Sequence, residues 1–493
     1  MLYQLTRRII AMDTNLTEGV KNLLGNPKKA IVKLSIPMMI AMFVQAMYNL
    51  VDAIWVSGLG ADALAAVGLF FPFFFLIVAL SNGIGVGGSS AISRRIGEKN
   101  KKAADNTAIH TLLMGLLVGL MVSLPFLPFL KSIFTSLGAK GEVADMSTDY
   151  ARILFAGAIF IFFANIANAI LRGEGDTKRA MYAIIVGSIL NIVLDPIYIY
   201  VLGMGVVGAA WATLTSMLIS ATLFLYWLFI KRDTYVEITL RDFYPNRKIV
   251  KEIFRVGIPA SLAQLSMSIS MFFLNLIVIL AGGTDGVAIF TTGWRIVTLG
   301  TIPLLGMAVA VTSVTGAAYG AKDVEKLNTA YMYAIKIGII MELAISLFTF
   351  LFAPQITLAF TYSKEAERIA DDLVIFLRWM SLNYPTVPLG MLSSAMFQGI
   401  GKGETALAVT IIRTIILSVP LAYFFGVVLN LNLTGIWWGI IIGNALGALI
   451  GFSIGRLIIG KFRIKFRVDT AESAGSKKYF INKKLKGQKR YKG

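Results

Sequence analysis

Twelve apolar segments, each long enough to cross a lipid bilayer, follow one another along the sequence. A spanning helix needs about 20 mostly apolar residues, and here 57% of the 493 residues are hydrophobic and only 15% are charged. We therefore predict an all-α membrane protein with twelve transmembrane helices. Their expected positions are residues 33–56, 66–92, 108–130, 147–171, 180–201, 206–230, 253–281, 287–317, 330–353, 372–399, 405–428 and 434–460.

The distribution of positive charge indicates the orientation of these helices. Lys and Arg concentrate before the first helix, in every second loop and in the C-terminal segment. The alternate loops carry only Lys131, Lys140, Lys364 and Arg368. Because basic residues mark the cytoplasmic side, we predict a multi-pass cell-membrane protein with both termini in the cytoplasm. The net charge of +19 thus reports topology and gives no reason to expect a nucleic-acid partner.

The chain repeats itself after 222 to 226 residues. The stretch Lys33-Leu-Ser-Ile-Pro37 returns as Arg255-Val-Gly-Ile-Pro259, and Gly97-Glu-Lys-Asn returns as Gly320-Ala-Lys-Asp. The segment that begins at Arg172, Arg-Gly-Glu-Gly-Asp-Thr, returns as Gln-Gly-Ile-Gly-Lys-Gly from Gln398. Each copy contains six spans, and because this number is even, both copies enter the membrane from the same side and have the same orientation. We therefore expect two six-helix lobes related by a pseudo-two-fold axis along the membrane normal.

These boundaries divide the chain into five parts. We expect a cytoplasmic N-terminus (1–29) without a spanning helix, an N-lobe (30–230), a cytoplasmic inter-lobe loop (231–252), a C-lobe (253–460) and a basic tail (461–493). Met1 and Met12 both remain possible starts. The tail has too few apolar residues to pack and is expected to be disordered. It could serve as a solvated topology determinant or bind anionic headgroups.

An acid inside the fifth apolar segment is the first candidate functional residue. Asp195 lies in Asn191-Ile-Val-Leu-Asp195-Pro196, where a charge costs about 2.5 to 3.5 kcal/mol in lipid and is therefore turned toward a cavity. Asn191 shares its helical face. Pro196 leaves one backbone carbonyl unpaired and provides a hinge. These oxygen groups suit a proton or a hard cation such as Na⁺. The alternative is that Asp195 only fixes helix packing.

A second acid lies at a matching depth in the first segment. Gln45, Tyr48, Asn49 and Asp52 recur at spacings of three and four residues, which forms one polar stripe on an apolar helix. The stripe must face the lobe interior, where Asp52 meets Asp195, and Gln45, Tyr48 and Asn49 are candidates to line a substrate cavity. Thr213 and Tyr150, near the same membrane boundary, could complete the ion site. They could equally be interfacial residues.

The second copy serves as an internal control for these acids. It has Val419-Pro420 where the first copy has Asp195-Pro196, and it has no acid near Leu274-Asn275, the counterpart of Asp52. If the acids served packing that both lobes share, both copies would carry them. The asymmetry favours a coupling-ion site in the N-lobe.

At these residues the sequence resembles the multidrug and toxic compound extrusion (MATE) family, in particular the archaeal branch of its DinF-type subfamily. The resemblance covers about residues 16–460 and is most specific in Met47-Tyr-Asn-Leu-Val-Asp52-Ala-Ile-Trp-Val-Ser-Gly-Leu-Gly60 and in Leu171-Arg-Gly-Glu-Gly-Asp-Thr177. It implies two lobes around an outward-open V-shaped cavity and export of organic compounds driven by H⁺ or Na⁺. It further implies a cation and proton network of Asp52, Asn168, Asn191, Asp195 and Thr213, with Tyr150 nearby.

Several implications follow for ligands and partners. A proton would be carried by the whole network, whereas Na⁺ would be held by Asp52, Asn191, Asp195 and Thr213, and the sequence does not decide between the two ions. No cofactor is expected. The expected partners are small organic substrates, often cationic and amphiphilic, and membrane lipid, with the monomer as the functional unit. Pro37 is a second candidate hinge. The alternative function is a lipid-linked oligosaccharide or lipid flippase of the same two-lobe plan.

The remaining polar residues indicate no enzyme. The chain has no Cys and one His, and it lacks a nucleophile-and-base pair or a Walker motif. His110 is expected at the surface or interface. Among the charges inside C-lobe spans (Arg295, Lys336, Glu342 and Arg413), we expect Glu342 to pair with an arginine and hold the lobe together, with a second ion site as the alternative.

Overall fold

The computed structural model describes residues 16–239, 241, 243–361 and 367–489, with side chains described as far as residue 466. Over these residues the fold is helical. The first half contains α2 (Glu18–Leu24), α3 (Pro27–Ser57), α4 (Ala61–Gly97), α5 (Lys101–Ser123), η1 (Leu127–Phe129), α6 (Leu130–Ser136), α7 (Gly141–Ala156), α8 (Ala158–Gly173), α9 (Thr177–Pro196), η2 (Ile197–Val201), α10 (Gly205–Leu225) and η3 (Tyr226–Lys231).

The second half repeats this order. It contains α11 (Arg247–Gly320), α12 (Val324–Leu351), α13 (Ala353–Phe360), α15 (Ala370–Ser381), η5 (Tyr384–Thr386), α16 (Val387–Gly399), α17 (Gly403–Ile411), η6 (Ile412–Ser418), α18 (Val419–Tyr423), η7 (Phe424–Val428) and α19 (Asn432–Lys489).

The described helices account for the twelve predicted spans. Nine are long and apolar enough to cross a membrane, or ten when α7 and α8, bent by 48° at Gly157, count as one broken span. Helix α11 is two spans, because Gly283 interrupts it with φ 59° and ψ −152°. The interrupted pair α15 and α16 forms the remaining span. The two six-helix lobes expected from the sequence are confirmed.

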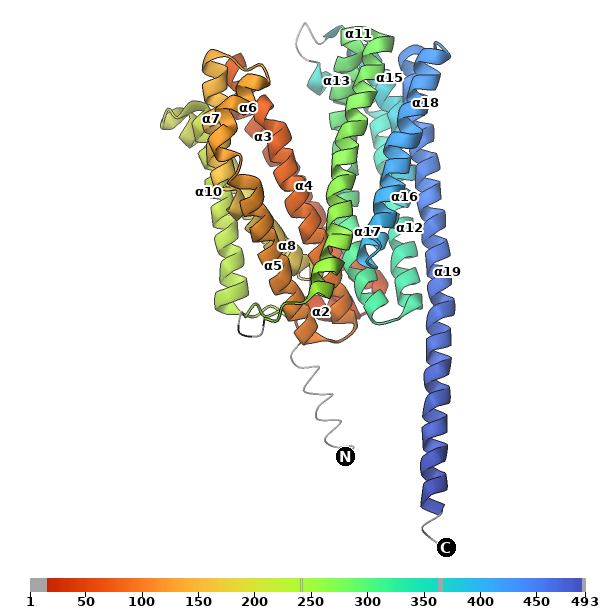
Figure 1. The fold of residues 1–493 in the computed structure, drawn as a ribbon. Coiled ribbons are helices and arrows are strands. Elements are labelled where there is room, and N and C mark those ends of the chain that lie inside the picture. The colour runs from red at the N-terminus through yellow and green to blue at the C-terminus, as the bar shows by residue number, and fades with distance from the viewer. Residues whose placement is uncertain (1–15, 240, 242, 362–366, 490–493) are drawn as a thin grey trace.

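The lobes stand side by side and diverge from one end of the bundle (Figure 1). We call this the inner end, because α2 and the far end of α19 lie there. Helix α4 of the N-lobe and α11 of the C-lobe pack closely against each other. An added Cβ on Gly97 would collide with the carbonyl of Ala317, and one on Gly320 would collide with the carbonyl of Arg94. Glycine thus permits the close approach of the two backbones.

The internal repeat extends to backbone conformation. Lys99 and Lys322, in the turns after α4 and α11, both have φ of 57°. Gly175 and Gly401, in the turns after α8 and α16, have φ of 85° and 80°. Positive φ is uncommon outside glycine, so its recurrence at the repeat offset indicates that both copies use the same turns.

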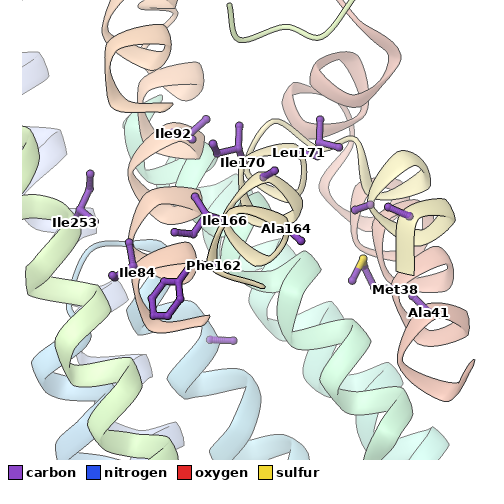
Figure 2. Packing of buried hydrophobic residues seen from close by; sticks show 14 of the residues in the cluster. Met38, Ala41, Ile84, Ile92, Phe162, Ala164, Ile166, Ile170, Leu171 and Ile253 are labelled. Carbon is purple, nitrogen blue, oxygen red and sulfur yellow. The ribbon is translucent and has the colours of Figure 1, made fainter. Parts of the chain in front are cut away.

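Side-chain packing inside the N-lobe fixes α8 against its neighbours. Phe162, Ile166 and Ile170 point from α8 toward α4 and the surrounding core (Figure 2). Ile166 fills the space at Gly115 of α5, where an added Cβ would collide with it. This packing holds the α8–α9 turn, and with it Arg172, against the inner end of the lobe.

The inter-lobe segment after η3 is docked on the N-lobe. The backbone N–H of Glu237 donates to Asp105 Oδ1 at 2.8 Å, and that of Val236 donates to Glu174 Oε2 at 2.9 Å. His110 is buried, and its Nε2 accepts from the Asn246 N–H at 3.1 Å. The expectation that His110 lies at the surface was therefore wrong, because the docked segment covers it.

Helices lie near both ends of the described part of the chain. Helix α2 contacts both lobes: Gly19 packs on Gly175, and Lys326 Nζ donates to the Leu24 carbonyl at 2.6 Å. Helix α19 continues to Lys489 and extends well beyond the bundle (Figure 1), where we expected a disordered tail after residue 460. Low apolar content argues against packing, but a helix satisfies its own backbone hydrogen bonds without it.

Candidate functional site

The two acids predicted from the sequence meet inside the N-lobe. Asp52 on α3 and Asp195 on α9 place their carboxyl groups within hydrogen-bonding reach of each other. Asp195 is fully buried, and its Oδ1 has no hydrogen-bond partner among the described residues. Two carboxylates this close cannot both stay charged without compensation, so a shared proton or a bound cation must cancel at least one of the two charges.

Asn191 links the acid pair to α10. In one amide orientation its Nδ2 donates to Thr213 Oγ1 at 3.3 Å. With the amide turned over, Nδ2 donates to Asp195 Oδ2 at 2.9 Å and the amide oxygen accepts from the Thr213 N–H at 3.2 Å. The second orientation gives both amide atoms a good partner. Asp195, Asn191 and Thr213 therefore form one connected polar group.

The backbone changes form directly beside Asp195. Helix α9 ends at Pro196 and continues as the π-helical turn η2. Proline has no N–H to donate, so the regular ladder is interrupted there. Tyr200 in this turn donates from its hydroxyl to the Trp55 carbonyl at 2.6 Å. The two acid-bearing helices are thus joined just beyond the acids. Pro37 lies inside α3 without breaking it.

Two tyrosines lie beside the acid pair, whereas Asn168 does not join it. Tyr48 and Tyr150 are close enough to interact electrostatically with both acids, and Tyr150 also packs edge-on against Phe70. Asn168 donates to the Ala180 carbonyl at 3.0 Å instead. Asn168 lies near the end of α8, which continues to Gly173, and its position in the helix therefore places it away from the acids.

A central cavity of about 550 Å³ lies between the lobes. Gln45, Tyr48 and Asn49 line it, as do Asn191 and Thr213 of the polar group around Asp195. Methionines on both lobes add flexible apolar surface, which suits loosely specified ligands: Met42, Met217, Met267 and Met391. The polar stripe on α3 therefore faces this cavity. Cavity and acid pair share residues, so events at one can affect the other.

Hydrogen bonds between the lobes close the inner end of the cavity. Ser90 Oγ of α4 donates to the Gln398 carbonyl, and Ser313 Oγ of α11 donates to the Arg172 carbonyl at 2.8 Å. Ser90 and Ser313, and likewise Arg172 and Gln398, are equivalent positions of the repeat. The two bonds form a reciprocal pair that we call the serine latch. The sequence analysis missed it, although the repeat offset contained the signal.

Ion pairs reinforce the serine latch. Glu252 at the start of α11 accepts from Arg95 at 2.9 Å and lies 3.6 Å from Arg94, both at the end of α4. Arg94 is buried and Glu252 is partly exposed, so solvent screens these pairs only in part. Their value here lies in joining the two lobes at the same level as the serines.

Glu342 does not have the partner that we expected. It is fully buried on α12, and neither carboxylate oxygen has a hydrogen-bond partner within the described residues. Arg295 is exposed on α11, and Arg413 lines the central cavity. The prediction of a Glu342–arginine pair was wrong, because the helices carry these arginines in other directions.

Repeated lobes around a shared cavity, with an ionisable pair beside it, define a multi-pass membrane protein of the secondary-transporter class. The MatE family model matches residues 37–197 and again residues 259–424, once in each lobe. The chain belongs to the MATE family.

Individual relatives cover nearly the whole chain. The multidrug export protein MepA of Staphylococcus aureus (strain NCTC 8325 / PS 47) is 27% identical over 445 residues, which is 90% of this chain and 96% of MepA. A MATE structure in the bent conformation is 57% identical with a TM-score of 0.87, covering 92% of this chain and all of the other. A MOP-superfamily transporter from Pyrococcus furiosus Vc1 (DSM3638) is 57% identical with a TM-score of 0.88, covering 91% of this chain and 99% of the other. That transporter is described as having a binding pocket of reversed polarity, which suggests a different function for it.

Proposed function

We propose that this protein exports organic compounds across the cell membrane in exchange for H⁺ or Na⁺. The observation that carries the proposal is the Asp52–Asp195 pair beside a cavity shared by both lobes. The similarity to a multidrug export protein supports the same direction of transport. The flippase alternative is not favoured, since the family and the matched relative are exporters.

The acid pair couples ion entry to the shape of the N-lobe. Charged carboxylates hold Asn191, Thr213 and neighbouring polar groups around them. An entering proton, or Na⁺ held by the oxygens of Asp52, Asn191, Asp195 and Thr213, cancels one of the two carboxylate charges and weakens that arrangement. The lobe then repacks, with Pro37 and Pro196 as the points where α3 and α9 bend at low cost. Tyr150 contributes to the surroundings of the pair, whereas Asn168 lines the cavity away from it.

Opening to the other side requires the serine latch to break. The structure is closed where Ser90, Ser313, Arg95 and Glu252 join the lobes. We place this inner end in the cytoplasm, with both termini, because Lys and Arg concentrate in the loops there. During export the protein then alternates between the conformation described here, with its inner end closed, and a conformation in which these contacts are broken and the inner end is open.

The proposal includes the molecule's partners. The chain works as a monomer with no cofactor, no nucleic-acid partner and no enzymatic activity, and its ligands are small organic substrates and membrane lipid. Substrates contact the cavity wall at Gln45, Tyr48 and Asn49, together with the cavity methionines.

The test uses purified protein in proteoliposomes loaded with ethidium. Efflux is recorded under a pH gradient alone and then under a Na⁺ gradient alone. We expect accelerated efflux under at least one gradient, and the one that works identifies the ion. The proposed function is contradicted if neither gradient makes efflux faster than it is without a gradient and in protein-free vesicles.

A further inference from the structure

Lys336 is a cation inside the membrane-spanning part of α12, on the lipid-facing surface of the C-lobe. It lies about 18 Å along the helix from Val324, at 1.5 Å per residue. Its side chain is exposed and does not line the central cavity. No ion pair or side-chain hydrogen bond of Lys336 occurs within the described part of the chain. Because a charge in this position is costly, it favours an anionic partner from outside the protein.

Lys28 of the N-lobe supplies a second cation at the same place. It belongs to the first turn of α3, and its Nζ lies 5.8 Å from the centre of the Tyr333 ring on α12. Among the described residues Lys28 has no acidic partner either. Helices α3 and α12 pack against each other across the two lobes. We call this place the α3–α12 seam, defined by Lys28, Tyr333 and Lys336.

The geometry of α12 brings the charge of Lys336 toward that of Lys28. Tyr333 and Lys336 are three residues apart and are therefore neighbours on the helix surface. Helical side chains tilt toward the N-terminus of their helix, and α12 begins at the inner end, where Lys326 donates to the Leu24 carbonyl of α2. A lysine stem also lies along apolar surface while its charge reaches for the membrane boundary. We therefore expect the ammonium of Lys336 to approach the level of Lys28.

Apolar side chains border the seam beyond the two lysines. Ile36 and Ile40 on α3 are 51% and 46% exposed, and Ile340 and Leu343 on α12 are 56% and 51% exposed. Cations at the inner end of an exposed apolar surface match a phospholipid, whose charged headgroup lies at the boundary while its acyl chains extend into the bilayer. Basic pockets between spanning helices bind anionic headgroups in this way.

The internal repeat provides an equivalent seam without these charges. At the repeat offset of 222 residues, Lys28 corresponds to Val250 on α11, and Lys336 corresponds to Met114 on α5. Helices α11 and α5 pack against each other as well. The fold therefore accommodates apolar residues at both places. Packing that the two copies share does not require the two lysines, which are an addition to the common scaffold.

We propose that the α3–α12 seam binds an anionic phospholipid, with its phosphate between the ammonium groups of Lys28 and Lys336 and its acyl chains along α3 and α12. A soluble phosphate compound shares the headgroup chemistry but leaves the apolar border uncovered, so the lipid is the occupant that fits both parts of the site. The bound lipid contacts both lobes. This inference goes beyond the proposed export function, because it does not depend on the exported compound or on the ion that drives export.

The test measures lipid binding to the detergent-purified full chain by native mass spectrometry. Dioleoyl phosphatidylglycerol and dioleoyl phosphatidylcholine have the same acyl chains and differ in net charge. The dissociation constant of the first bound lipid is compared in wild type, Lys28→Gln/Lys336→Met and the control Lys248→Gln/Lys251→Gln. Methionine is the residue that the first copy has at this place, Met114. The control removes two exposed cations at the start of α11, outside the seam.

We expect wild type and the control to bind phosphatidylglycerol about tenfold more tightly than phosphatidylcholine, because two lysines attract the anionic headgroup. In Lys28→Gln/Lys336→Met this preference should disappear while affinity for phosphatidylcholine is kept. The basic tail (461–493) is unchanged in every variant, so this loss would place the preference at the seam. Equal affinities in wild type, an unchanged preference in the double variant or an equal loss in the control overturn the proposal.

Three further measurements keep the interpretation clear. If the double variant does not fold, Lys336→Met alone should reduce the preference about threefold, since one of two lysines is lost, and an undiminished preference contradicts the proposal. Glycerol 3-phosphate is added as a soluble competitor and should leave the lipid bound, whereas displacement of the lipid would overturn its assignment. Gradient-driven ethidium efflux is recorded with the same preparations. Absent efflux with an intact lipid preference contradicts the export function alone, so the two proposals fail separately.

Discussion

The carboxyl groups of Asp52 on α3 and Asp195 on α9 lie within hydrogen-bonding reach of each other. Their two helices are joined a short distance away by the hydrogen bond from Tyr200 to the Trp55 carbonyl. Because the helices are linked at this level, a change of charge between the acids acts on both of them. This relationship is the basis of the coupling that we propose.

The first prediction concerns the individual acids. Asp52→Asn and Asp195→Asn should each abolish gradient-driven efflux, since each removes an ionisable group from the same pair. The control is Asp62→Asn, an exposed acid in the first turn of α4, which should transport like wild type. Melting temperatures confirm folding. Wild-type efflux by both variants would exclude the pair as the coupling site.

The second prediction concerns the serine latch. Ser90→Ala/Ser313→Ala removes both latch bonds, together with the bond from Ser90 to the Gly399 carbonyl and the bond that Ser90 accepts from Arg94. The closed inner end should therefore lose at least about 2 kcal/mol, at about 1 kcal/mol for each latch bond. That is about a 30-fold shift toward inner opening. The chain has no cysteine, so a single Cys at the cavity residue Ser394 reports access to an impermeant maleimide from the inner side. Labelling should accelerate.

The latch experiment has a matched control within one lobe. Ser270 and Ser346 donate to the carbonyls of Thr414 and Ser381, all in the C-lobe. Ser270→Ala/Ser346→Ala removes two similar bonds without touching the contact between the lobes. If this control accelerates labelling as much as the latch variant does, loss of stability in general, and not the latch, controls access.

The third prediction follows from Glu174 in the turn after α8. Burial raises the pKa of Glu174 to about 8, with Asp176 acting in the same direction, although the Val236 N–H and Arg179 oppose this rise. The unfolded chain releases this proton near pH 4.5, so stability should fall as the pH rises from about 5 through 8. Glu174→Gln has no ionisable group at this position and therefore lacks this loss of stability with rising pH. Its melting temperature should approach or exceed that of wild type as the pH rises.

A melting curve series in the same detergent from pH 5 to 9 checks the Glu174 prediction. The difference between variant and wild type should grow with pH and level off above about 8. A constant difference across this range would show that Glu174 is charged in the folded protein.

The fourth prediction concerns Glu342, whose oxygens have no hydrogen-bond partner among the described residues. Had an arginine paired with it, Glu342→Gln would have left a buried charge and lowered stability by several kcal/mol. Without that partner, we expect the melting temperature to stay unchanged or to rise. A large drop would mean that an interaction absent from this conformation holds Glu342 in place.

Sequence reasoning predicted the fold because membrane insertion leaves few choices. Apolar length, basic loops and the repeat at Pro37 and Pro259 determine the spans and the two lobes. The acid pair was predictable as well, since a carboxylate such as Asp195 in an apolar segment must face an interior. Partners beyond one helix were not predictable: the direction of Glu342 and the burial of His110 depend on how separate helices rotate and on a docked segment.

The most direct test of the account measures whether the acid pair moves the N-lobe. Spin labels on cysteines at Ile54 of α3 and Ile189 of α9, both exposed side chains, report the distance between these helices. A tenfold ion preference for one conformation supplies about 1.4 kcal/mol, enough to shift a balanced population visibly. We predict that pH or Na⁺ shifts this distance distribution in the wild-type background and does not shift it in Asp52→Asn/Asp195→Asn. The same shift in the double variant would contradict the account.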